Sequence, residues 1–142
     1  MYAKSNILIV DDDEVVRLSH LRSLQGDSRE LEAVGDGEDA LRLMGQQRFD
    51  VVLLDLSMPG MDGMQVLRAI KQSWPESEVV VITGYPTVET AKEAVRLGAY
   101  DYLAKPIGPD EVISATDGAL TRKKWALREI HDETAIGALA AS

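Results

Sequence analysis

The sequence predicts an α/β fold in which five parallel strands form one sheet with helices on both faces. Short apolar runs alternate regularly with segments whose apolar residues recur at helical spacing. Runs that are apolar throughout are typical of strands buried on both faces, as in a parallel sheet between two helix layers. The order, a strand and then a helix five times over, is that of a doubly wound α/β sandwich with right-handed crossovers.

The predicted strands differ in how apolar they are. The segment between Arg29 and Gly35 is short and more polar than the others, so we expect it nearer an edge of the sheet. The other four runs cover residues 7–10, 51–54, 79–82 and 100–104, of which the last is the weakest.

The predicted helices begin and end at residues that favour helix termini. Thr87 is a candidate N-cap, and Gly98 is a C-terminal stop for the same helix. Pro109 begins the last helix, where proline is favourable in the first turn. The helices are expected at residues 15–24, 36–44, 64–73 and 87–97, and from 109 onward.

Length and composition are those of one acidic globular domain. The chain has 142 residues, a net charge of -9 and no cysteine. The charge argues against direct binding to nucleic acid, and the lack of cysteine excludes disulfides and thiolate chemistry. No apolar run approaches the roughly 18 residues of a membrane span. We therefore expect a cytoplasmic protein.

The composition changes near Thr121, which divides the chain into a main domain, residues 1–120, and a C-terminal segment, residues 121–142. The segment begins with a basic stretch and ends in small residues. We interpret it as a helical extension or the remainder of a linker, with the last helix continuing toward residue 130.

Polar side chains follow the predicted strands at the points where the strands end. In an open parallel sheet, ligands bind beyond the carboxyl ends of the strands, near the point where strand order reverses. Four strand ends therefore bring carboxylates, a hydroxyl and an ammonium group to one rim. The residues are Asp11, Asp12, Asp13, Asp55, Thr83 and Lys105.

Such a cluster of carboxylates requires a cation. Two unit charges about 4 Å apart repel by roughly 4 kcal/mol at an effective dielectric constant near 20. A hard divalent ion with oxygen ligands, such as Mg²⁺, offsets this repulsion, and Lys105 adds a second positive charge. A carboxylate nucleophile, a metal, a lysine and a hydroxyl are together what phosphoryl transfer needs.

Motifs at these strand ends resemble those of the receiver domain of two-component response regulators. The resemblance extends from about Asn6 to Leu120 and implies a flavodoxin-like fold. The motifs are Val10-Asp11-Asp12, Leu54-Asp55, Met58-Pro59-Gly60-Met61-Asp62-Gly63, Ile82-Thr83-Gly84 and Lys105-Pro106.

The resemblance implies that Asp55 accepts a phosphoryl group from a phosphohistidine on a sensor kinase or phosphotransfer protein. Asp12 would bind Mg²⁺ directly, together with the Asp55 carboxylate and the backbone carbonyl of Ser57, and Asp11 would hold the ion through water. Such a domain is not an enzyme, apart from self-catalysed phosphotransfer and autodephosphorylation.

The resemblance also implies how phosphorylation is reported. Thr83 would hydrogen-bond the phosphoryl group, Lys105 would pair with its oxygens, and Tyr102 would turn inward as Thr83 moves. The fourth helix, fifth strand and fifth helix would then control an output domain, an effector or a homodimer. The Lys105-Pro106 bond is expected to be cis.

Several residues have a plainer interpretation than a role in the site. Asp13 and Asp62 are expected to cap helices. Tyr85 is equally consistent with covering the phosphorylation site or with no role in it. Surface or packing positions are expected for His20 and His131, and Trp125 is expected at a helix contact or interface.

A phosphatase of the haloacid dehalogenase type is the alternative from another functional class. Asp11 and Asp13 have the spacing of its Asp-x-Asp motif, which would make Asp11 the nucleophile. The rest of that motif, a later acidic pair and a cap domain are missing from the sequence.

The output of the domain stays open between two alternatives. The chain is either a free-standing regulator or a receiver whose DNA-binding or catalytic domain is missing. Residues 82–91 and 98–102 resemble receivers of the nitrogen-regulation type, which are often fused to transcription activators, and so they favour the second alternative.

Overall fold

A computed structural model describes residues 4–58 and 60–124, and it confirms the predicted architecture. Five parallel strands form one sheet in the order β2-β1-β3-β4-β5, with the predicted edge strand at one edge. Strand order reverses between β1 and β3, because the chain goes outward to β2 and then crosses back. The strands are β1 (Ser5–Val10), β2 (Arg29–Val34), β3 (Val51–Asp55), β4 (Glu78–Thr83) and β5 (Asp101–Ala104).

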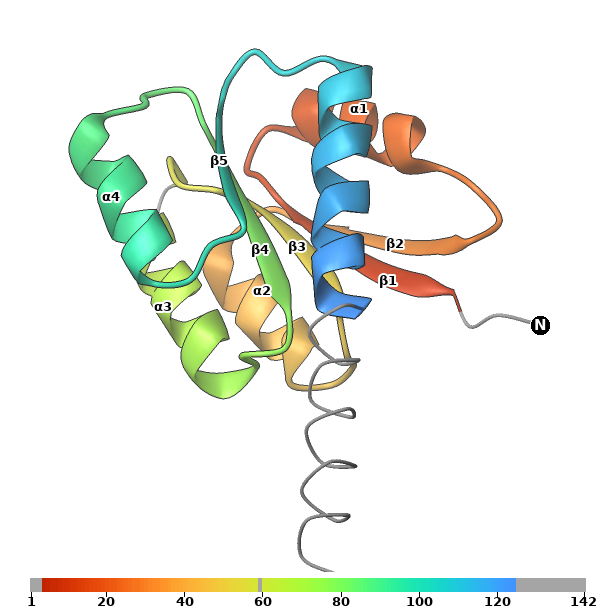
Figure 1. Ribbon diagram of the computed structural model, residues 1–142, viewed down its shortest axis with the longest axis horizontal. Coiled ribbons are helices and arrows are strands. Elements are labelled where there is room, and N and C mark those ends of the chain that lie inside the picture. Colours follow the sequence, from red (N-terminus) through yellow and green to blue (C-terminus); the bar gives the residue numbers. More distant parts are fainter. Residues whose placement is uncertain (1–3, 59, 125–142) are drawn as a thin grey trace, which may run out of the picture.

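Helices cover both faces of the sheet (Figure 1). On one face lie α1 (Glu14–Leu24) and a C-terminal helix that occupies residues 109–124 of the described chain. On the other face lie α2 (Gly37–Met44), α3 (Gly63–Ser73) and α4 (Val88–Arg96). Among the described residues, no helix has both the length and the apolar character to cross a membrane.

Two apolar clusters join the sheet to its helices, because successive side chains of a strand point to opposite faces. Residues Leu8, Val52 and Val79 pack toward α2, α3 and α4. Their chain neighbours Ile7 and Val51 pack toward α1 and the C-terminal helix. All five are fully buried, which is why the central strands read as continuous apolar runs.

Capping side chains begin the helices as predicted. The Asp13 carboxylate accepts a hydrogen bond from the backbone N–H of Val15 at 2.9 Å. Asp62 caps α3 in the same way, and Thr87 caps α4. These bonds satisfy N–H groups that have no partner within the helix. Asp13 and Asp62 therefore serve as caps, as expected.

A buried ion pair fixes the end of the C-terminal helix against the sheet. Lys123 is only 7% exposed, and its Nζ lies 2.5 Å from Oδ1 of Asp50. The other oxygen of Asp50 accepts a hydrogen bond from the N–H of Asn6 at 2.8 Å. This helix passes the predicted boundary at residue 121, whereas Trp125, His131 and the predicted continuation toward residue 130 lie outside the described residues.

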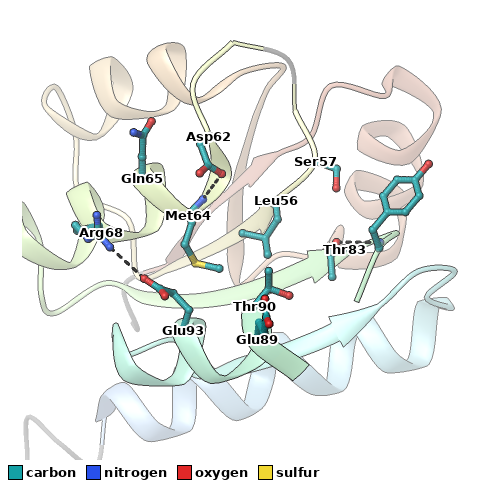
Figure 2. Close-up of a pocket in the computed structure, with 11 residues that line it drawn as sticks. Leu56, Ser57, Asp62, Met64, Gln65, Arg68, Thr83, Glu89, Thr90 and Glu93 are labelled. Carbon is teal, nitrogen blue, oxygen red and sulfur yellow. Dashed lines mark hydrogen bonds and ion pairs between the residues drawn. The ribbon is translucent and has the colours of Figure 1, made fainter. Parts of the chain in front are cut away.

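A groove of about 540 Å³ separates α3 from α4 and opens at the carboxyl ends of β3 and β4 (Figure 2). Leu56 and Met64 line it from the α3 side, and Thr90 lines it from α4. An ion pair between Arg68 and Glu93, with 3.1 Å between Nη2 and Oε1, joins the two helices across it. The groove thus connects the rim of the sheet to α4.

His20 is a packing residue in α1, one of the two options expected for it. The side chain is 5% exposed, and Nδ1 has no hydrogen-bond partner among the described residues. Burial lowers the pKa of His20; the charge of Asp11 opposes this shift and that of Lys105 adds to it. The nitrogen is thus buried without a hydrogen bond from the part of the chain that the structure describes.

We expect His20→Leu to stabilise the protein by about 1 kcal/mol at neutral pH, the lower end of the cost of a buried unsatisfied group. The gain should grow as the pH falls below 6.5, the ordinary histidine pKa, because the unfolded wild type then binds a proton that the folded state resists. Urea unfolding of both proteins across this pH range measures the gain. A variant less stable than wild type would show that Nδ1 has a partner.

Candidate functional site

Asp55 is the last residue of β3 and lies at the point where strand order reverses. Its side chain is 2% exposed, and Oδ1 accepts a hydrogen bond from the N–H of Ser57 at 3.0 Å. Burial raises the pKa of Asp55; the Ser57 bond opposes the shift, Asp11 adds to it, and Lys105 opposes it. The carboxylate is held firmly, but its charge is poorly solvated.

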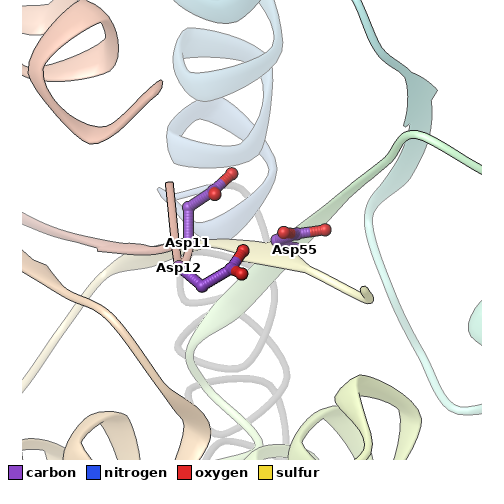
Figure 3. Close-up of side chains that lie close together, drawn as sticks. All are labelled: Asp11, Asp12 and Asp55. Carbon is purple, nitrogen blue, oxygen red and sulfur yellow. The ribbon is translucent and has the colours of Figure 1, made fainter. Parts of the chain in front are cut away.

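Asp11 and Asp12 lie beside Asp55 because β1 and β3 are neighbouring parallel strands. Their register pairs Val10 with Leu54, so the next residues of both strands emerge together at the rim. Each of the three aspartates offers a carboxylate oxygen within 4.8 Å of the other two (Figure 3). Asp11 is buried and Asp12 is exposed.

The donor set fits a hard divalent cation. Three carboxylates from two adjacent strand ends supply oxygen ligands, which are the ligands that Mg²⁺ and Ca²⁺ prefer. The exposed Asp12 leaves one side open to water or to a further ligand, as Mg²⁺ commonly requires. The arrangement also brings together like charges that a bound cation would offset.

The ammonium group of Lys105 contacts the carboxylates of both Asp11 and Asp55. Its Nζ lies 2.9 Å from Oδ2 of Asp11 and 3.3 Å from Oδ2 of Asp55. Burial by itself would lower the pKa of Lys105, but the hydrogen bond and charge of Asp11, with those of Asp55, raise it overall. The side chain therefore stays an ammonium, and the Lys105-Pro106 bond is cis, as the resemblance implies.

Thr83 ends β4 and faces the same rim. It is 1% exposed, and its Oγ1 accepts a hydrogen bond from the N–H of Tyr85 at 3.1 Å. Together with Ser57 it lines the groove between α3 and α4 (Figure 2). The Tyr85 side chain is 80% exposed at the mouth of this groove.

Tyr102 is tied to the start of α4. Its hydroxyl lies 2.5 Å from Oγ1 of Thr90 and accepts a hydrogen bond from the N–H of Thr87 at 3.2 Å. Thr87 is also the N-cap of α4, so the hydroxyl holds the first turn of the helix to β5. Thr83 and Tyr102 thus bond to the segment that joins β4 to α4 at two points, Tyr85 and Thr87.

Arg17 is a residue of the site that the sequence did not bring to attention. Its guanidinium Nη1 donates a hydrogen bond to the backbone carbonyl of Asp11 at 2.8 Å. The only signal in the sequence is an arginine four residues after the helix-capping Asp13, on the helix that follows the acidic run.

Comparisons with known proteins agree on one family. The model of the response regulator receiver domain matches residues 7–117. The regulatory protein AtoC of Escherichia coli K12 is 40% identical over 135 residues, which are 92% of this chain and 29% of that protein. The transcriptional regulator NtrC of Klebsiella pneumoniae is 36% identical over 113 residues, 80% of this chain and 24% of that protein. The chain thus spans less than a third of these relatives.

Solved structures match over a similar extent. A CheY-like receiver domain protein from Methanospirillum hungatei superposes with a TM-score of 0.84 at 25% identity, covering 87% of this chain and 99% of that one. NtrX from Brucella abortus superposes with a TM-score of 0.83 at 34% identity, covering 92% of this chain and 30% of that one.

Proposed function

This chain is a receiver domain of the response regulator family, and we propose that it accepts a phosphoryl group on Asp55 in a reaction that depends on Mg²⁺. The observation that carries the proposal is the buried Asp55 carboxylate, which lies beside the carboxylates of Asp11 and Asp12 and within ion-pair distance of the Lys105 ammonium. Clustered carboxylates repel one another, and a bound divalent cation would offset that repulsion.

In the proposed step an Asp55 oxygen attacks the phosphorus of a phosphohistidine. A P–O bond forms, the P–N bond breaks, and the released imidazole keeps the bonding electron pair and takes up a proton. Lys105 and the Ser57 N–H, which both contact the Asp55 carboxylate, would stabilise the charge that develops on the phosphoryl oxygens. When bound by Asp11, Asp12 and Asp55, Mg²⁺ would supply the rest of that charge neutralisation.

The domain would act as a switch, and not as an enzyme that turns over a separate substrate. Phosphorylation adds about two negative charges, which gives the Thr83 hydroxyl a new partner. Moving Thr83 would disturb the bond that its Oγ1 accepts from Tyr85, and with it the segment that leads to Thr87 and Tyr102. The phosphoryl group would thereby shift an equilibrium between two arrangements of α4.

The partners follow from this chemistry. A sensor histidine kinase or phosphotransfer protein would donate the phosphoryl group in the cytoplasm, where ATP is available to charge it. The surface of α4, β5 and the C-terminal helix would contact an output domain, an effector or a second copy of the chain. Relatives more than three times as long as this chain favour an output domain.

We expect acetyl phosphate to label the protein in Mg²⁺ and the labelling rate to fall at least about tenfold in excess EDTA. Without the ion, the carboxylate cluster repels the incoming phosphate, and each 1.4 kcal/mol added to the activation free energy slows the reaction about tenfold. Intact-mass spectrometry measures the labelled fraction over time. Adding Mg²⁺ back after EDTA should restore labelling, which controls for damage to the protein. Equal labelling with and without EDTA would contradict the dependence on a divalent cation.

A further inference from the structure

Every hydrogen-bonding group of Asp11 is engaged, and the engagements come from four directions. Its N–H donates to the carbonyl of Val34 at 3.1 Å, so β2 fixes one side of the residue. Its carboxylate accepts from the N–H of Asp13 and from Lys105. Its carbonyl accepts from Arg17. Of these, the bond to the carbonyl fixes the plane of the Asp11–Asp12 peptide.

The orientation of the Asp12 side chain depends on the plane of the Asp11–Asp12 peptide. Its side chain is exposed, and within residues 4–58 and 60–124 no hydrogen bond or ion pair of the Asp12 carboxylate is found. Because a peptide unit is planar, holding the Asp11 carbonyl also holds the N and Cα atoms of Asp12, and the side chain departs from that Cα. The direction of the Asp12 carboxylate toward Asp55 is thus set through the backbone.

Arg17 is well placed to hold the peptide firmly. The residue is partly buried and lies on α1 against the end of β2, where a methyl group added to Gly35 would lie 3.3 Å from Nη1 and 3.9 Å from Cζ. No carboxylate of the described chain lies within ion-pair distance of Arg17. Its side chain instead donates a hydrogen bond to the Asp11 carbonyl, which ties the guanidinium to the backbone of the acidic segment.

We propose that Arg17 is a positioning residue for the divalent cation, and that it acts by holding the Asp11–Asp12 peptide so that the Asp12 carboxylate faces Asp55. The proposal rests on the proposed function, because it concerns the same cation. This positioning role can be distinguished from an effect of the Arg17 charge alone, because the two would change cation binding in opposite directions. Removing a positive charge near three carboxylates would by itself strengthen cation binding, whereas losing the hydrogen bond to the peptide would weaken it.

The experiment compares Mg²⁺ binding by wild type, Arg17→Met, Arg17→Lys and Gly35→Ala. The rise in melting temperature with Mg²⁺ concentration gives the half-saturating concentration, and the melting temperature without Mg²⁺ reports folding. We expect the half-saturating concentration to rise about tenfold in Arg17→Met, as for other residues that orient a metal ligand. Arg17→Lys keeps a donor and should fall between this variant and wild type.

Gly35→Ala tests the same hydrogen bond between Arg17 and Asp11 through a substitution outside α1, and it leaves the charge of Arg17 in place. Gly35 has no left-handed backbone, so an added methyl group acts only by displacing the guanidinium. We expect about threefold weaker Mg²⁺ binding, as for a hydrogen bond that is strained and not lost. Arg22→Met is the matched control, since Arg22 is an exposed arginine of the same helix, and it should bind Mg²⁺ like wild type.

A second measurement separates positioning from general damage. At saturating Mg²⁺, acetyl phosphate should label Arg17→Met at nearly the wild-type rate, because the ion then restores the position of Asp12. Wild-type Mg²⁺ affinity in both Arg17→Met and Gly35→Ala, or tighter binding in Arg17→Met, would overturn the role of Arg17. A wild-type protein that does not respond to Mg²⁺ would instead overturn the proposed function itself.

Discussion

Replacement of Asp55 by asparagine is expected to abolish labelling by acetyl phosphate and, at the same time, to make the metal-free protein more stable. The labelling rate should fall by at least about 10²-fold, because the variant lacks the attacking oxygen anion. The free energy of unfolding should rise, because Asp55 has a raised pKa, which means that its charged form is less favourable in the folded than in the unfolded protein.

The pH dependence of this gain has a definite sign. A group whose folded pKa is raised costs stability above that pKa, and the cost disappears as the pH falls toward the ordinary aspartate value of 3.8. The stability difference between Asp55→Asn and wild type should therefore be largest near neutral pH and should shrink on acidification. Urea unfolding in EDTA at a series of pH values measures it.

Asp50→Asn is the matched control, since Asp50 immediately precedes β3 and Asp55 ends it. Asp50 pairs with the buried Lys123 and lies at the opposite end of the sheet from the cluster. The control should label normally and lose about 3 kcal/mol of stability, because Lys123 is left as a buried charge without a partner. Labelling of Asp55→Asn at the wild-type rate would show that another residue accepts the phosphoryl group.

Gly63→Ala is expected to disrupt both stability and labelling. A methyl group at Gly63 would lie 2.5 Å from Cα and 2.7 Å from the carbonyl oxygen of Leu56. These are backbone atoms, so the strain can be relieved only by moving the segment that follows Asp55 and carries the N–H of Ser57. We expect a loss of about 3 kcal/mol in the free energy of unfolding, at the upper end for an overpacked site.

Labelling of Gly63→Ala should slow as well, because the Ser57 N–H that orients Asp55 moves with this segment. The control is Gly108→Ala, where an added methyl group meets no atom within 4 Å. It should be as stable as wild type or gain about 0.5 kcal/mol through the unfolded state. Calorimetry and acetyl phosphate labelling of both variants test the pair. A Gly63→Ala protein with wild-type stability would contradict the close approach of α3 to Leu56.

The fold could be predicted because its signals are local. Apolar runs such as Val51 to Leu54 mark strands that are buried on both faces, and the more polar β2 lies at an edge, where one side is less covered. Which side chains of a helix are buried could be predicted less well from the apolar pattern. In α1, Val15 is 74% exposed and Leu18 is 48% exposed, whereas His20 is buried. Leu24, an apolar residue of the same helix, is buried, so His20 is the buried position that apolarity did not indicate.

The candidate site could be predicted as far as parallel strands determine it. Asp11 and Asp55 meet because they lie at the ends of the neighbouring parallel strands β1 and β3. Lys105 follows β5, two strands away from β3, and its long side chain reaches both carboxylates. The contacts that orient these groups depend on how far a side chain reaches between elements. The bond of Tyr102 to Thr90 and that of Arg17 to Asp11 require the phase of a helix to be known within a fraction of a turn.

Mapping the phosphoryl group within the labelled protein tests the central proposal most directly. The wild-type chain would be treated with acetyl phosphate and Mg²⁺, cleaved with a protease at low pH, and the labelled peptide located by tandem mass spectrometry. The proposed chemistry predicts one phosphoryl group, on Asp55. A phosphoryl group on Asp11, the nucleophile of the phosphatase alternative, or one retained in Asp55→Asn, would contradict it.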